Sequence, residues 1–295
     1  MGFYLNTGDI YALLTALCWS SAVILFDLSS RRLSSLQMNL LKNFIGMTGF
    51  VLTLLLLGKG FPKLSSIDLG ILVFSGVLGV ALGDLLFLAS LRRLGAGLNA
   101  IVSTSYSPAV FLFAFLMFKE TITTQSYAGA VLVIAGITVG SLKIPSQSDN
   151  KDILKGVVYG VGAAALTAYS VLLVRPIMES YSVIFVALVR FSTGFILSSL
   201  FLWISKGRNA LTDTMKTGLR NPYLVTGALL GTYLSVILWL SGYKYTLAGR
   251  AAIYNQLSTI LIILMAAVFL KEPMTIRKWL AVGLAVCGAL LVSSA

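Results

Sequence analysis

The chain has 295 residues, of which 58% are hydrophobic and 11% charged, with a formal net charge of +12. Soluble domains carry roughly 25% charged residues, so this composition excludes a soluble globular protein and indicates that a bilayer is its solvent. The absence of histidine and the presence of only two cysteines exclude haem, catalytic-triad and tetrahedral zinc sites that use imidazole, as well as a disulfide framework. No metal or cofactor is therefore expected.

Ten apolar stretches of spanning length follow one another along the chain, each close to the roughly 20 residues that a transmembrane helix needs. Alternating apolar and polar residues of the barrel type are absent, so the spans are predicted to be helices. The connections are too short to hold a separate soluble catalytic domain. The predicted helices cover residues 10–28, 36–57, 69–91, 98–118, 126–142, 154–174, 182–204, 223–243, 249–270 and 277–294.

The two halves of the chain are related by an internal repeat. A shift of 152 residues, from 78 to 230, superposes several motifs without a gap. The aligned motifs are LGVALGDLLFL (78–88) with LGTYLSVILWL (230–240), AGLNAI (96–101) with AGRAAI (248–253), and FKETIT (118–123) with LKEPMT (270–275).

This repeat predicts the architecture. Each copy has five helices, and an odd number forces the two copies to enter the membrane in opposite directions. The chain is therefore predicted to be an all-α polytopic membrane protein with ten transmembrane helices in two inverted five-helix repeats. The repeats are residues 1–143 and 154–295, joined by a loop at 144–153. Inverted repeats are typical of transporters, which bind substrate near the midplane where the repeats meet.

Basic residues mark the orientation in the cell membrane rather than a nucleic-acid surface, because they flank the apolar runs. Loops after odd-numbered spans carry 14 Lys and Arg, and the other loops carry six. The positive-inside rule then makes the first set of loops cytoplasmic and places both termini outside.

Three ionisable side chains lie well inside predicted spans, where each costs on the order of 2.5–3.5 kcal/mol and therefore indicates function. Asp84 and Lys42 lie at a similar depth from the same face, which makes them a candidate pair. Asp84 is predicted either to bind a coupling proton or cation or to form a structural ion pair with Lys42, which can also snorkel. Arg190 either faces the cavity and binds a carboxylate or phosphate, or it is a structural anchor that caps backbone carbonyls or extends to the membrane interface.

Polar side chains at helical spacing in the fourth and ninth spans predict matching stripes. They are either a cavity lining or interhelical hydrogen-bond partners. Pro108, in the fourth span, is expected to kink the helix and free the carbonyl of Thr104. The stripes comprise Asn99, Ser103 and Tyr106 in the fourth span and Asn255 and Ser258 in the ninth, extended there by Tyr254, Gln256 and Thr259.

Three aromatic residues near the middle of their spans can form pocket walls or pack in the core. These residues are Trp19, Tyr169 and Trp239.

The segments FLMFKETITTQSYAGAVLVIAGI (115–137) and AVFLKEPMTIRKWLAVGLAVCGA (267–289) resemble the EamA-type branch of the drug/metabolite transporter superfamily. The resemblance extends over essentially the whole chain. It implies a secondary transporter for small metabolites, often amino acids and often exported, with a cavity lined by both halves. A basic residue in the second and seventh spans is typical. Arg190 fits this pattern, whereas the second span offers only Lys42 or Asn43. The resemblance also implies cytoplasmic termini, contrary to the charge count.

The resulting functional expectation is a secondary active transporter that moves a small polar or amphipathic metabolite across the cell membrane by alternating access. Its expected partners are this solute, membrane lipids and a coupling proton or ion, with the chain acting as a monomer or homodimer. A passive channel is the first alternative, although the polar stripes are too local for a continuous pore lining. A lipid-modifying membrane enzyme is the second, and the lack of metal-ligand or nucleophile motifs argues against it.

Overall fold

The protein is all-helical in a computed structural model that describes residues 7–58, 62–119, 123–141, 150–245 and 248–293. The side chains at 118, 126, 141, 150, 248–256 and 292–293 lie outside that description. The first half contains α1 (Thr7–Ser30), α2 (Ser35–Leu56), α3 (Ser66–Ser75), the π-helical η1 (Gly76–Gly83), α4 (Asp84–Ser103), α5 (Tyr106–Phe118) and α6 (Thr124–Ser141).

The second half repeats this series of elements. It contains α7 (Asn150–Val174), the short α8 (Ile177–Ser180), α9 (Val183–Gly218), α10 (Pro222–Ala228), the π-helical η2 (Leu229–Leu234), α11 (Ser235–Tyr245), α12 (Ala248–Phe269) and α13 (Ile276–Ser293).

Two glycines explain where predicted spans and observed helices differ. Gly95 has φ 73° within α4, and Gly207 has φ 80° within α9. Glycine adopts this left-handed region without the steric cost of a Cβ atom. The third span therefore runs through α3, η1 and the start of α4 and ends near Gly95. The fourth comprises the rest of α4 and α5, and the segment of α9 after Gly207 lies beyond the seventh span.

Six of the described helices are long and apolar enough to cross a membrane, including the continuous segments Ser66–Ser103 and Pro222–Tyr245. Three shorter apolar segments, Tyr106–Met117, Tyr127–Gly140 and Leu257–Phe269, occupy the places predicted for the fourth, fifth and ninth spans. With α13 at the tenth place, the described helices match the predicted order of ten spans.

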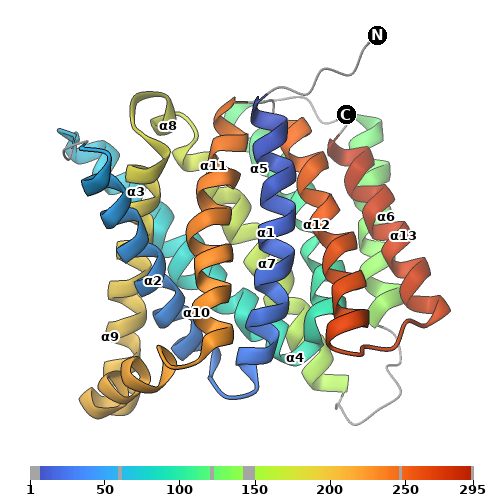
Figure 1. The fold of residues 1–295 in the computed structure, drawn as a ribbon. Coiled ribbons are helices and arrows are strands. Elements are labelled where there is room, and N and C mark those ends of the chain that lie inside the picture. Colours follow the sequence, from blue (N-terminus) through green and yellow to red (C-terminus); the bar gives the residue numbers. More distant parts are fainter. Residues whose placement is uncertain (1–6, 59–61, 120–122, 142–149, 246–247, 294–295) are drawn as a thin grey trace.

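The two halves run in opposite directions through the bundle. In Figure 1, α1 begins at the end of the molecule where α13 finishes, whereas α7 begins at the other end. Lys119 and Lys271, equivalent in the repeat, both have φ near 55° (55° and 56°). These are the two non-glycine residues with positive φ in the described part of the chain. The predicted inverted repeat is thus confirmed.

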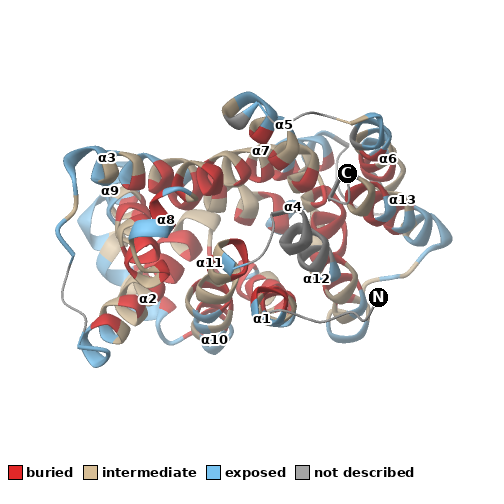
Figure 2. Cartoon of the chain, turned by 90° about the horizontal axis from the view of Figure 1, so that it is seen from above, coloured by how far each residue is buried: buried red, intermediate tan, exposed pale blue. Residues whose placement is uncertain are grey.

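The first helix of each repeat packs against the other repeat. Helix α1 lies against α11 and α12, and α7 lies against α4, η1 and α5. Seen from above, α2 and α9 pair at one end of the elongated bundle and α6 and α13 pair at the other (Figure 2). This exchange of first helices places α1 and α7 at the centre, where they border a shared cavity.

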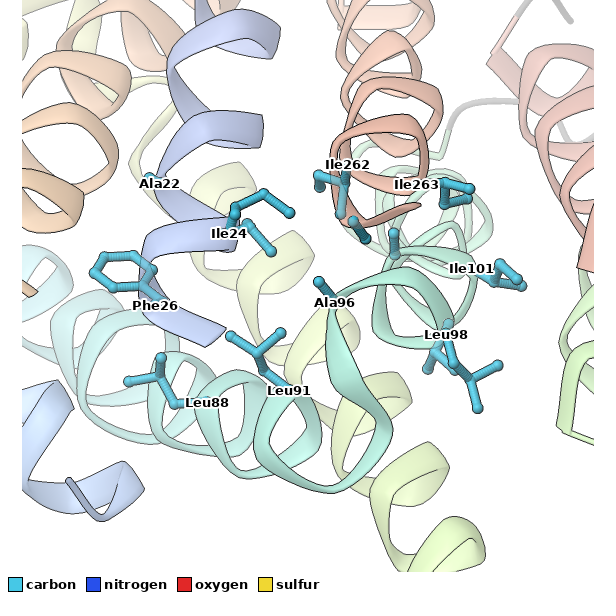
Figure 3. Packing of buried hydrophobic residues seen from close by; sticks show 14 of the residues in the cluster. Ala22, Ile24, Phe26, Leu88, Leu91, Ala96, Leu98, Ile101, Ile262 and Ile263 are labelled. Carbon is cyan, nitrogen blue, oxygen red and sulfur yellow. The ribbon is translucent and has the colours of Figure 1, made fainter. Parts of the chain in front are cut away.

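A hydrophobic cluster lies toward the end of the bundle where α1 connects to α2, the lower end in Figure 1. This end is called the basic face, because the exposed Arg31 and Arg32 belong to that connection, and the exposed Arg92 and Lys206 shortly precede the breaks at Gly95 and Gly207. Figure 3 shows side chains of α1, α4 and α12 gathered in the cluster. Its members, called the floor cluster, include Ala22, Ile24, Phe26, Leu88, Leu91, Ala96, Leu98, Ala100, Ile101, Ile262 and Ile263.

The kink expected near Pro108 lies just before it. Residues Thr104 and Ser105 separate α4 from α5, and Pro108 occupies the first turn of α5, where its missing N–H breaks no helical hydrogen bond. The expectation of a free Thr104 carbonyl is wrong, because this oxygen accepts a 3.2 Å hydrogen bond from the Ser107 amide. The tight turn satisfies the group that an uninterrupted helix would have left exposed.

Candidate functional site

A cavity of about 210 Å³ lies between the two repeats. Residues of α1, α2, η1, α4, α5, α7, α9, η2, α11 and α12 line it, whereas none of the described residues of α6 or α13 does. Phe26 and Leu88 belong to both the lining and the floor cluster, so this cluster borders the cavity on the side of the basic face. The position at the seam of two inverted repeats is where carriers bind their substrates.

An ion pair forms one polar part of the wall. Lys42 Nζ on α2 lies 2.5 Å from Asp84 Oδ2 at the start of α4. Lys42 is buried and also donates to Asn43 Oδ1 at 2.9 Å, while its ammonium lies 5.3 Å from the centre of the Phe191 ring. The structure thus brings together the two charges that share a depth in the sequence, and Lys42 does not snorkel out of the bundle.

Arg190 on α9 forms the second polar part of the wall. Its side chain is buried, and Nη2 donates a 3.0 Å hydrogen bond to Ser170 Oγ on α7. The Nε–H has no partner within the described structure, and no described carboxylate lies within 4.0 Å of the guanidinium. A buried guanidinium with an unpaired donor at a cavity wall is suited to bind an anion.

The broken helix formed by α4 and α5 contributes hydroxyl groups. Ser103 and Tyr106 line the cavity together with Ser258 of α12. The Ser103 hydroxyl donates to the Asn99 carbonyl at 2.8 Å, and the Tyr106 and Tyr243 hydroxyls are 3.1 Å apart. Both repeats therefore supply hydroxyls to one space, as the matching stripes predict.

The other predicted site residues divide into three groups. Trp19 and Trp239 line the cavity, where Trp19 packs on Phe87 with ring centroids 5.4 Å apart. Two residues are not part of the lining: Asn99 is buried near the floor cluster, and Tyr169 packs edge-on against Phe113 at 5.1 Å. The side chains of Tyr254 and Asn255 lie outside the described residues.

Sequence reasoning missed several small residues of the wall. Hydroxyl residues are common in transmembrane helices, where they often bond to the preceding turn, so no single one is a signal. Thr15 behaves in this way and donates to the Tyr11 carbonyl at 2.7 Å. The missed lining residues include Thr15, Thr167, Thr232 and Ser235, whereas Thr259, predicted on the stripe of the ninth span, does line the cavity.

Two glycines of the wall lie at equivalent places in the repeat. Gly79 in η1 and Gly231 in η2 are 152 residues apart, and both line the cavity. A Cβ atom at Gly79 would lie 2.9 Å from Arg190 Nη2 and closer still to Ser170 Oγ, whereas one at Gly231 would lie 2.5 Å from Ala22 Cβ. The 152-residue repeat offset is the sequence signal that pairs these two glycines.

The described residues contain no group of three or more His, Cys, Asp or Glu side chains that could hold a metal ion. The site instead offers one ion pair, one incompletely paired guanidinium, hydroxyls and aromatic walls. Inverted repeats around such a cavity define a multi-pass membrane transporter rather than an enzyme.

The chain belongs to the EamA-like transporter family, whose model matches residues 6–142 and again residues 154–294. It is 22% identical to the uncharacterized transporter YetK of Bacillus subtilis (strain 168) over 274 residues, which are 92% of this chain and 81% of that protein. It is also 24% identical to an uncharacterized transporter of Archaeoglobus fulgidus over 271 residues, 91% of each chain. A protein of known crystal structure, 15% identical in sequence, superposes on this chain with a TM-score of 0.67. The match covers 97% of this chain and 96% of the chain in that crystal structure. This likeness shows a shared fold.

Proposed function

We propose that this transporter is a secondary active carrier that exports a small metabolite with an anionic group, such as an amino acid, by alternating access. The unpaired Nε–H of buried Arg190 is the observation that carries the proposal. An uncompensated buried charge is costly in a bilayer, so a carboxylate beside the guanidinium would be bound by charge-assisted hydrogen bonds.

The remaining wall supports an amphipathic solute. Trp19, Phe87, Phe191 and Trp239 offer apolar surface, and the hydroxyls of Ser103 and Ser258 offer a small number of polar contacts. A mostly apolar pocket with few convergent polar groups is the usual form of a small-molecule site. Export and the amino-acid class follow from the family resemblance, and the two inverted repeats provide the halves that rock.

Arg190→Ala is expected to reduce transport of carboxylate substrates in proteoliposomes by roughly 10- to 150-fold, since a hydrogen bond to a charged group contributes about 1.5–3 kcal/mol. The decarboxylated amine of the same solute should be affected much less. Arg190→Lys should retain part of the activity, because its charge remains but the bidentate fork is lost.

The substrates for this measurement come from a metabolite panel screened by thermal stabilisation of the purified protein, since a ligand of the folded state raises apparent stability. Equal losses for the acid and the amine would contradict the anion site. Saturable uptake with counterflow is expected from a carrier, and linear, non-saturating flux would instead support a channel.

Gly79→Ala tests the same contact without removing the charge. The added methyl group would displace the Arg190 guanidinium and the Ser170 hydroxyl, so affinity for the anionic substrate should fall and stability should drop by about 1–3 kcal/mol. Gly70→Ala is the matched control, because a Cβ there meets nothing within 4 Å. Ligand-dependent and ligand-free melting temperatures of both variants give the two readouts.

A further inference from the structure

Asn99 on α4 is a buried amide without hydrogen-bond partners in the described structure. Its exposed fraction is 1%, and neither Nδ2 nor Oδ1 has a partner. Leaving buried donors and acceptors unpaired is costly, so such a group calls for an explanation. Asn39 on α2 shows the usual arrangement, because its Nδ2 donates to Val80 O, Ala81 O and Ser198 Oγ.

Asn99 lies directly along the helix from the cavity wall. It precedes Ser103 by four residues, one turn of α4, and so lies on the same face of the helix, closer to the basic face. Its neighbours in sequence, Leu98 and Ala100, belong to the floor cluster, and Figure 3 shows Leu98 and Ile101 on this part of α4. The amide is therefore in line with the cavity but covered by the floor.

A polar clamp holds this part of α4 in place at the basic face. Glu272, between α12 and α13, accepts a 3.2 Å hydrogen bond from the Gly97 amide through Oε1, and its Oε2 lies 2.5 Å from Lys278 Nζ. Gly97 is in the first turn after the break at Gly95, where a carboxylate is stabilised by the helix dipole and the free amides. The clamp therefore fastens the second repeat to the first.

The glycines at the break fit the clamp closely. A Cβ at Gly97 would lie 2.5 Å from both Glu272 Oε2 and Lys278 Nζ, and one at Gly95 would lie 3.2 Å from Glu272 Oε1. Larger residues at Gly97 would push the carboxylate and the ammonium away. The contact of Glu272 and Lys278 with Gly97 thus connects the two repeats, two residues before the unpaired amide of Asn99.

We propose that Asn99 is a polar contact of the translocation pathway that is covered in this conformation, and that Glu272 and Lys278 hold the cover closed. The proposal rests on alternating access and extends it: when α4 and α12 separate at the basic face, the Asn99 amide meets water or the polar group of the solute. The unpaired amide favours opening, and the clamp opposes it. The balance of the two sets the conformational equilibrium.

Stability separates this role from a structural one. Replacing an unpaired buried amide with an apolar side chain of similar size removes a penalty, so Asn99→Leu should leave the melting temperature unchanged or raise it while reducing transport about tenfold. Asn39→Leu, the matched control, removes the hydrogen bonds of both Nδ2 and Oδ1 and should lower the melting temperature. A loss of stability in Asn99→Leu equal to that in Asn39→Leu would overturn the proposal.

Accessibility tests the clamp without a substrate. In a Cys18→Ala/Cys287→Ala background, Asn99→Cys should react slowly with a membrane-impermeant maleimide applied at the basic face. Adding Glu272→Gln should accelerate labelling about tenfold, because a neutral amide caps the helix and pairs with Lys278 more weakly. Ala100→Cys, the control on the neighbouring buried position, should stay unlabelled in both backgrounds.

The outcomes have distinct meanings. No acceleration at Asn99→Cys, or equal acceleration at Ala100→Cys, would overturn the clamp and the covered contact. Selective acceleration in a protein that moves no solute would keep the conformational inference and remove the carrier function. A loss of carboxylate selectivity in Arg190→Ala has no bearing on either labelling result.

Discussion

Asp84→Asn is expected to destabilise the protein by about 3–5 kcal/mol, because it leaves the buried Lys42 ammonium without its ionised partner. Lys42→Met should cost less, because the Asp84 carboxylate that it isolates is 22% exposed at the cavity wall and can be hydrated there. The double variant Lys42→Met/Asp84→Leu removes both charges and should recover most of the loss, since replacing a buried pair with apolar residues is often neutral. Thermal unfolding of the purified proteins in one detergent measures all three.

The exposed carboxylate of Asp213 provides the control for this series. Asp213→Asn removes one negative charge from the surface and should change stability by less than about 0.5 kcal/mol. Additive losses in the double variant would show that Lys42 and Asp84 act independently, contrary to the 2.5 Å contact.

The same double variant distinguishes ion coupling from a structural pair. If Asp84 binds a coupling proton or cation, a stable Lys42→Met/Asp84→Leu protein should exchange solute across the membrane but fail to accumulate it against a pH or ion gradient. A purely structural pair predicts gradient-driven accumulation in the stable double variant. Counterflow and gradient-driven uptake in the same proteoliposomes give the two rates.

The fold was predictable because its determinants are repeated and extended. The ten apolar stretches and the recurrence of FKETIT as LKEPMT can be recognised in the sequence without any knowledge of how the helices pack. The π-helical turns were not visible, since the insertion of one residue into a helical turn leaves no compositional mark. The breaks at Gly95 and Gly207 depend on φ angles that the sequence permits but does not require.

The site residues were predictable where their depth in the membrane and the helix face they occupy together determine whether they reach the cavity. Lys42 and Asp84 share a depth from the same face, and Ser103 and Tyr106 lie on the polar stripe, so all four reach the cavity. Asn99 has the same phase as Ser103 but lies one turn deeper, among residues of the floor cluster. The spacing of residues in the sequence shows which face of the helix a side chain occupies. The depth at which the floor cluster ends the cavity depends instead on how α1, α4 and α12 pack.

Gly288→Leu is expected to be among the most damaging substitutions outside the cavity. Even a Cβ at Gly288 would lie 2.5 Å from the Gly129 carbonyl oxygen and 2.7 Å from the Val133 amide nitrogen, both backbone atoms of α6. Backbone atoms cannot rotate aside, so α6 and α13 must separate and lose the close packing that holds helices together in lipid. A loss of more than about 3 kcal/mol is expected, with Gly288→Ala at about 1–3 kcal/mol.

Gly283 on the same helix is the matched control, because a Cβ there meets nothing within 4 Å and alanine is the better helix former. Gly283→Ala should keep or slightly raise the melting temperature. Since the described residues of α6 and α13 do not line the cavity, folded Gly288→Ala protein should keep the substrate affinity and selectivity of the original protein. A changed selectivity at normal stability would mean that this helix pair moves during transport and takes part in shaping the binding site.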